Sequence, residues 1–228
     1  MSRAVVLLLA AGEGARIGRG AKAFLPLRGR AIVAVAAENA AQCPEVGALV
    51  VAVPRGFEDE ARRSVDVAKP VTIVTGGSRR QDSVRLALDA VPQEFDVAVC
   101  HDAARPFAGP ELFTSVIAGL SEGDGVIPAL PPPDTVKRVR NGYVEETLPR
   151  EDLRLVQTPQ AFVAAALREA HRRALAEGVH RTDDAALLEW AGFRVRVVPG
   201  EPSNFKITAP EDLARAEQVL IGVPSAGA

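Results

Sequence analysis

The 228-residue chain has few cysteines, few aromatic residues and no excess of basic charge. Its two cysteines, Cys43 and Cys100, are too few for a disulfide framework, and no histidines stand at ligand spacing to complete a zinc site. The formal net charge of -2, from 27 basic and 29 acidic residues, argues against a general nucleic-acid or membrane-surface binder. No apolar run is long enough to span a membrane, and the N-terminal apolar segment leads into a glycine loop where a signal peptide would have its cleavage site. We therefore expect a cytoplasmic protein.

The composition, 47% hydrophobic and 25% charged, is that of a globular domain able to bury a full core. Apolar runs alternate with helix-like segments from residue 4 to residue 130, which predicts right-handed crossovers and an α/β fold with a mostly parallel sheet flanked by helices. Among the helices we expect segments at 32–42, 57–67, 110–120, 162–177 and 182–190.

Residues 131–150 interrupt this alternation. Asn141-Gly142 lies between the strand-like runs 135–139 and 143–147, which is a strong signal for a β-hairpin. Because an isolated hairpin is rarely stable, we expect this arm to pack against a second copy of the chain. We assign 1–222, arm included, to a single domain and 223–228 to a disordered tail.

The loop that follows the first apolar run contains Ala10, Ala11, Gly12, Gly14 and Arg16. Small residues let the backbone approach a phosphate chain and direct N–H groups toward it, and the arginine adds a cation. The loop lacks the Gly-Lys-Ser/Thr of a Walker loop and the third glycine of a dinucleotide fingerprint. We interpret it as a triphosphate-binding loop; the alternative is a tight strand-to-helix turn.

His101-Asp102 ends the fourth predicted strand, at the sheet edge where α/β proteins bind ligands. A carboxylate there suits Mg²⁺, which uses few protein ligands. The alternative is that Asp102 caps the next turn and pairs with Arg105. We interpret His101 as structural, because phosphoryl transfer requires mainly charge and positioning.

Further candidates are Lys22, the Arg79-Arg80 pair after Gly76-Gly77, and Lys206. Lys206 alternates with apolar neighbours and so faces either solvent or a second anion site. Ser83 is either a residue of a helix N-terminus or a ligand hydroxyl.

These segments belong to an ordered set. In chain order the set is Leu9-Ala10-Ala11-Gly12-x-Gly14-x-Arg16, Lys22, Gly76-Gly77, Asp82-Ser83-Val84, His101-Asp102-Ala103-Ala104-Arg105-Pro106, Asp134-Thr135-Val136-Lys137, Gln157-Thr158-Pro159-Gln160, Thr182-Asp183-Asp184-Ala185 and Asn204-x-Lys206-x-Thr208. Over nearly its whole length the chain thereby resembles the 2-C-methyl-D-erythritol 4-phosphate cytidylyltransferases of the non-mevalonate isoprenoid pathway.

The resemblance implies a Rossmann-like nucleotidyltransferase domain, a homodimer joined by the arms, and Mg²⁺-dependent transfer from CTP to methylerythritol phosphate. It implies nucleotide contacts from Ala10, Ala11, Gly12, Gly77, Ser83 and Ala103, and Mg²⁺ binding by Asp102. It implies catalytic roles for Arg16, Lys22, Lys206 and Arg150. On the substrate side it implies Arg105, Thr135, Thr158 and Lys206, with Arg150 coming from the neighbouring subunit.

The chain departs from the family pattern at Ala21-Lys22-Ala23, where Pro-Lys-Gln is usual, and at Ser78, where an acidic residue is common. No second catalytic domain follows the last predicted helix, so we expect the single-function form. Two alternatives stay open: a cytidylyltransferase for ribitol 5-phosphate or another polyol phosphate, and a non-catalytic nucleotide-binding module.

Overall fold

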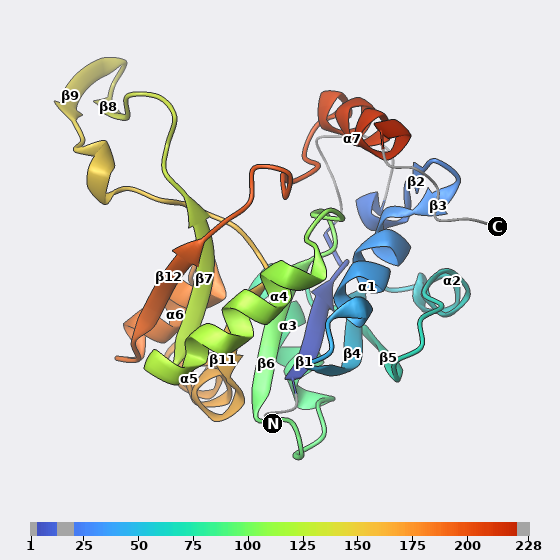
Figure 1. Cartoon of the computed structure of the whole chain (residues 1–228). Coiled ribbons are helices and arrows are strands. Elements are labelled where there is room, and N and C mark those ends of the chain that lie inside the picture. Colours follow the sequence, from blue (N-terminus) through green and yellow to red (C-terminus); the bar gives the residue numbers. More distant parts are fainter. Residues whose placement is uncertain (1–3, 13–20, 223–228) are drawn as a thin grey trace.

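The computed structural model describes residues 4–12 and 21–222, which form helices on both faces of a central sheet (Figure 1). The helices are α1 (Ile32–Gln42), α2 (Glu58–Ser64), α3 (Arg80–Asp89), α4 (Pro110–Ala118), α5 (Ala164–Glu177), α6 (Asp184–Trp190) and α7 (Pro210–Gly222). Short 3-10 turns form η1 (Lys22–Phe24), η2 (Gly119–Glu122) and η3 (Arg150–Asp152).

The central sheet has the strand order β10-β7-β11-β6-β1-β4-β5, with β12 paired to β7. Its strands are β1 (Ala4–Leu9), β4 (Val46–Val53), β5 (Val71–Thr75), β6 (Val97–Asp102), β7 (Gly125–Leu130), β10 (Leu155–Val156), β11 (Gln160–Val163) and β12 (Val195–Pro199). The pairs β1–β4, β1–β6, β4–β5 and β7–β12 are parallel, whereas β11 is antiparallel to β6 and β7. The prediction of a mostly parallel sheet flanked by helices is confirmed.

The apolar run of β1 is continuous because the strand is covered on both faces. Val6 and Leu8 pack in one cluster with side chains of α1 and α4, and Val5 and Leu7 pack in a second cluster with side chains of α3, α5 and α6. Each fully buried side chain of this size stabilises the fold by about 1.5–3 kcal/mol. This core fixes the ends of the strands, where the candidate site lies.

Four predicted helices are shorter than expected: α4 and α6 each lack two terminal residues, and two others give up residues to extended, buried backbone. The helix predicted over 162–177 begins only at Ala164, because Phe162 pairs with Ala98 in the sheet and packs its ring over Gly125. The helix predicted over 57–67 is Glu58–Ser64, and Val65 is already extended and buried. In both segments tertiary burial overrides the helix-like pattern.

The predicted hairpin is present as β8 (Lys137–Arg140) paired with β9 (Tyr143–Thr147), and it projects away from the sheet (Figure 1). Asn141 and Gly142 have φ values of 50° and 83°, the left-handed pair that a two-residue hairpin turn requires. Tyr143, at the start of β9, is 80% exposed. Val139 and Val144, paired across the strands, are also exposed.

Within the described residues no helix is long and apolar enough to cross a bilayer. Two predictions, the tail 223–228 and the stretch with Gly14 and Arg16, lie outside the described residues.

Candidate active site

The carboxyl ends of β1, β4, β5 and β6 meet at one edge of the sheet. Leu9 pairs with Ala52 of β4 and Asp102 of β6, and Val53 of β4 pairs with Thr75 of β5. At this edge lies a cavity of about 380 Å³. The candidate residues that line it are Ala10, Ala11, Gly12, Lys22, Gly77, Arg79, Arg80, Ser83, Asp102 and Lys206. Residues from positions 10 to 206 are thus brought to one place, as the topology of a parallel sheet predicts.

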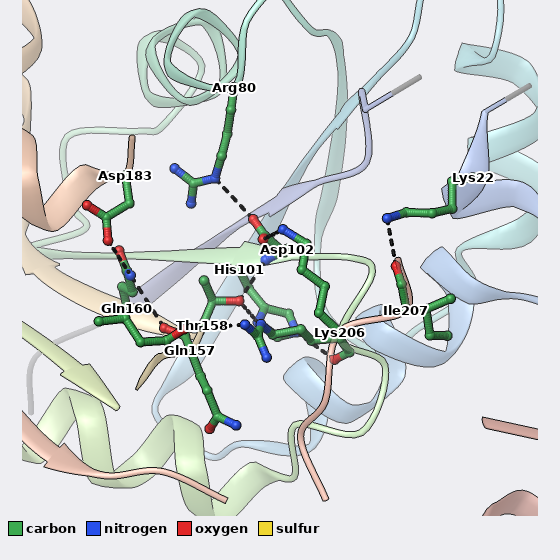
Figure 2. A network of polar contacts seen from close by, with 12 residues as sticks. Lys22, Arg80, His101, Asp102, Gln157, Thr158, Gln160, Asp183, Lys206 and Ile207 are labelled. Atoms are coloured by element: carbon green, nitrogen blue, oxygen red, sulfur yellow. Dashed lines mark hydrogen bonds and ion pairs between the residues drawn. The ribbon is translucent and has the colours of Figure 1, made fainter. Parts of the chain in front are cut away.

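Asp102 is held by two cations (Figure 2). Lys206 Nζ lies 2.6 Å from Oδ2, and Arg80 Nε lies 3.1 Å from Oδ1. Burial alone would raise the pKa of Asp102, but Arg80 and Lys206 together hold it well below its usual range. Arg105, the partner considered from sequence, donates instead to the carbonyl oxygens of Asn204 and Val156.

Arg80 reaches a second carboxylate that sequence reasoning missed. Its Nη1 donates to Asp184 Oδ2 at 2.7 Å, and Asp184 is 1% exposed. Asp184 lies in the first turn of α6, whereas Asp183 caps this helix by accepting from the N–H of Ala186. No local pattern links Arg80 to a residue 104 positions later; the fold alone brings them together.

His101 is fully buried beneath the cavity, and its hydrogen bonds fix its protonation. The carbonyl of Arg105 only accepts, so Nε2 of His101 carries the proton that donates to it over 3.2 Å. Nδ1 then accepts from the hydroxyl of Thr158 at 3.1 Å, and that hydroxyl accepts from the Asp102 N–H at 3.0 Å. Burial lowers the pKa of His101 to about 4, so the ring is neutral near pH 7. This supports a structural role.

Lys206 lies in an irregular segment, although its alternation with apolar neighbours is typical of a strand. Ile207 anchors this segment: its N–H donates to the carbonyl of Ala104 at 2.8 Å, and its carbonyl accepts from Lys22 Nζ at 2.7 Å. Asn204, fully buried, donates through Nδ2 to the carbonyl of Thr158. These contacts set the backbone position from which Lys206 reaches Asp102.

Gln157 also anchors the segment that precedes Lys206. Its amide donates to the carbonyls of Glu201 and Asn204, and its Oε1 accepts from the Glu201 N–H. Gln157 and Asn204 belong to the motifs quoted from sequence, but no role had been inferred for either. Their pairing, like that of Arg80 with Asp184, joins distant parts of the chain.

The loop after β5 closes against the loop after β1. A Cβ at Gly76 would lie 2.4 Å from Ala11 Cβ and 2.9 Å from Ser83 Oγ, so no side chain fits there without displacement. The Gly77 N–H donates to Ser83 Oγ at 3.1 Å. Ser83 is a buried residue of the first turns of α3, and it also lines the cavity.

Some of the predicted residues do not line the cavity. Ala103 is fully buried beside Asp102, and Arg105 and Thr158 lie behind it. Thr135 and Arg150 line a separate hollow of about 380 Å³ at the base of the arm. Those last two residues are therefore remote from the cavity within one chain, and Arg16 lies outside the described residues.

Asp102 is the carboxylate of the cavity among the described residues, which contain no cluster of three or more His, Cys, Asp or Glu side chains suited to a metal. A single carboxylate does not suit a structural metal site, which needs several protein ligands. It does fit Mg²⁺, which commonly takes one or two carboxylates together with the phosphates of its nucleotide.

A parallel sheet with a small-residue loop, lysines and one carboxylate at its carboxyl edge defines an α/β protein of the nucleotide-binding class. Residues 4–221 match the family model of 2-C-methyl-D-erythritol 4-phosphate cytidylyltransferase (IspD), and the chain belongs to that family.

Two relatives illustrate the match. The chain is 41% identical to the 2-C-methyl-D-erythritol 4-phosphate cytidylyltransferase of Gloeobacter violaceus, over 94% of this chain and 95% of the relative. It is 44% identical to the bifunctional enzyme IspD/IspF of Anaeromyxobacter dehalogenans, over 96% of this chain and 57% of the relative. The chain thus spans a little over half of the bifunctional relatives.

Solved structures share the fold. A crystal structure of the 2-C-methyl-D-erythritol 4-phosphate cytidylyltransferase from Thermus thermophilus superposes with a TM-score of 0.80 at 36% identity, covering 96% of this chain and 98% of the other. The 4-diphosphocytidyl-2C-methyl-D-erythritol synthase from Anaerococcus prevotii gives a TM-score of 0.87 at 29% identity, covering 96% and 99%.

Proposed function

We propose that this chain joins CTP to 2-C-methyl-D-erythritol 4-phosphate, forming the CDP-linked methylerythritol and releasing pyrophosphate. The observation that carries the proposal is one cavity lined by Asp102, Lys22 and Lys206 beside the small-residue loop 10–12. Membership of the family supports the choice of substrates, since the full-length relative from Gloeobacter violaceus carries that name.

In this proposal the nucleotide lies along the backbone of residues 10–12. Gly77 and Ser83 face the base, where amide and hydroxyl groups can read its edge, and Ala103 is near the ribose. The tight packing of Gly76 on Ala11 fixes the separation of the two loops between which the nucleotide would lie.

The chemistry is an in-line displacement. An oxygen of the substrate's phosphate attacks the α-phosphorus of CTP, a new P–O bond forms, and the bond from the α-phosphorus to the bridging oxygen of the β-phosphate breaks. Pyrophosphate departs with that electron pair. The attacking oxygen is already anionic, so no general base is needed, which agrees with a His101 that is neutral and hydrogen-bonded at both nitrogens.

Catalysis then consists of bringing two anions together. Two unit charges 4 Å apart repel by about 4 kcal/mol at an effective dielectric constant of 20. Lys206 offsets this cost at the substrate's phosphate, and Lys22 with Arg16 at the α-phosphate. Arg105, Thr135 and Thr158 complete the substrate side, and Asp102 would hold Mg²⁺, which when bound neutralises part of the triphosphate charge.

We further propose a homodimer in which the arms pack together and Arg150 of each chain serves the other chain's site. The exposed apolar residues Val139, Tyr143 and Val144 support this, because an isolated hairpin needs a packing partner. The cytoplasmic location stays a prediction from the sequence.

The deciding experiment measures pyrophosphate release with CTP and Mg²⁺, supplying methylerythritol 4-phosphate in one reaction and ribitol 5-phosphate in another. We expect release with the first. Release with ribitol phosphate alone would make the chain a cytidylyltransferase for another polyol. CTP binding without turnover of either substrate would favour a non-catalytic module.

A further inference from the structure

Arg80 bridges two carboxylates from distant parts of the chain. Its Nε donates to Asp102 Oδ1 at the end of β6, and its Nη1 donates to Asp184 Oδ2 at the start of α6. Arg80 itself is the first residue of α3. One guanidinium therefore ties three elements together beside the carboxylate of the cavity, which Arg80 also lines.

Asp184 is a fixed anchor for this bridge. It is 1% exposed, and His171 Nε2, itself buried, lies 3.5 Å from its second oxygen. Asp184 is also the first residue of α6, where the helix dipole favours a negative charge. A carboxylate so enclosed and so paired is a suitable anchor for the Arg80 guanidinium.

The two cations on Asp102 differ in this respect. Among the described residues Lys206 Nζ contacts the Asp102 carboxylate alone, and its side chain is 38% exposed. Arg80 also pairs with a second carboxylate, that of Asp184. Among the described residues Lys206 has no second carboxylate partner. Lys206 is thus the cation that can leave Asp102 for an incoming phosphate.

We propose that Asp184 and Arg80 are positioning residues that hold Oδ1 of Asp102 in place, so that Oδ2 can pass from Lys206 to a nucleotide-bound Mg²⁺. The proposal rests on the function proposed above. It requires an arginine, because a planar guanidinium can donate to two carboxylates at once in a fixed geometry, whereas the single ammonium of lysine carries the charge without that fork.

The test uses Arg80→Lys and Asp184→Asn, with Arg85→Gln as the matched control on the same helix. Arg85 pairs with Asp89 on the surface and does not line the cavity. CTP binding is measured by calorimetry with and without Mg²⁺ and without the second substrate, so the readout does not depend on turnover. Thermal unfolding and steady-state kinetics are recorded for each variant.

We expect Arg80→Lys to keep metal-free CTP affinity within about threefold while losing about 10- to 100-fold in Mg²⁺-dependent CTP affinity and in kcat, the usual cost of removing a group that orients a metal ligand. Asp184→Asn should act in the same direction. The double variant should lose no more Mg²⁺-dependent CTP affinity than Arg80→Lys alone, because both substitutions break the same Arg80–Asp184 bridge.

Normal Mg²⁺ dependence in Arg80→Lys would overturn the proposal. So would an equal loss of metal-free CTP affinity, since Arg80 would then serve the nucleotide itself. Should Asp184→Asn fail to fold, Arg80→Lys alone decides. If wild-type protein binds CTP in a Mg²⁺-dependent way but releases no pyrophosphate, the proposed function fails while this binding test still applies.

Discussion

Lys206 Nζ lies 2.6 Å from Asp102 Oδ2, although the two residues are 104 positions apart in the chain. Lys206 pairs with Oδ2 of Asp102, whereas Arg80, which is also paired with Asp184, pairs with Oδ1. In the proposed reaction Lys206 exchanges Asp102 for the phosphate of the second substrate, so its charge matters most when the two anions meet.

Replacing Lys206 by alanine should therefore reduce kcat much more than CTP affinity. Loss of one preorganised cation at a developing charge costs on the order of 100- to 1000-fold in kcat, and we expect CTP affinity to change by only a few-fold. Steady-state kinetics and calorimetry with CTP provide the two numbers. The control is Lys69→Ala, which removes a lysine from the loop before β5. A collapse of CTP binding in Lys206→Ala would show that Lys206 serves the nucleotide and not the second substrate.

His101 should make the stability of the protein depend on pH. Its pKa is lowered by burial from 6.5 to about 4, so between these values the unfolded chain binds a proton that the folded chain does not. The free energy of unfolding then rises with pH by about 1.4 kcal/mol per unit, up to roughly 3 kcal/mol over the interval. Below that interval this contribution is lost.

The measurement is urea unfolding across this pH range for wild type and His101→Gln, in which we expect the slope to flatten. Asp102 and Asp184 do not contribute to this slope. Their pKa values are lowered in the folded protein, so the stability that their charged forms provide is lost only below about pH 4. His180→Gln, at an exposed histidine, is the control. An unchanged slope in His101→Gln would mean that another group is responsible.

The sequence predicted the site to the extent that the site follows from strand ends. Ala10, Gly77 and Asp102 follow or end predicted strands, and parallel strands bring their carboxyl ends to one edge. The hairpin was likewise predictable, since Asn141-Gly142 specifies its own turn. Such features depend on a few neighbouring residues, and local pattern suffices for them.

Contacts between distant residues were not predictable in this way. Nothing near Arg80 distinguishes it from Arg79, and only the fold, which brings the start of α6 to the start of α3, gives it Asp184 as a partner. Phe162 was assigned to a helix because its neighbours favour one, whereas its place is decided by Gly125 in the adjacent strand. In each pair the determining partner lies far away in the sequence.

The arm offers the last prediction, which concerns assembly. Val139 and Val144 are cross-strand partners, 56% and 60% exposed, and a homodimer would bury this face. Val139→Lys combined with Val144→Glu removes the apolar face yet keeps the hairpin, because opposite charges are favourable across paired strands. With apolar side chains lost from both chains, we expect the dimer dissociation constant to rise at least about 100-fold, or roughly 3 kcal/mol.

Light scattering across a dilution series measures this constant, and Leu175→Lys, at an exposed leucine of α5, controls for surface charge. The variant should also show a raised KM for the polyol phosphate, because Arg150 from the partner chain would no longer reach the site. CTP affinity should stay near the wild-type value, since every described residue assigned to the nucleotide belongs to one chain. A double variant that remains dimeric with an unchanged KM would move the interface away from the arm, and the supply of Arg150 in trans would then have to be abandoned.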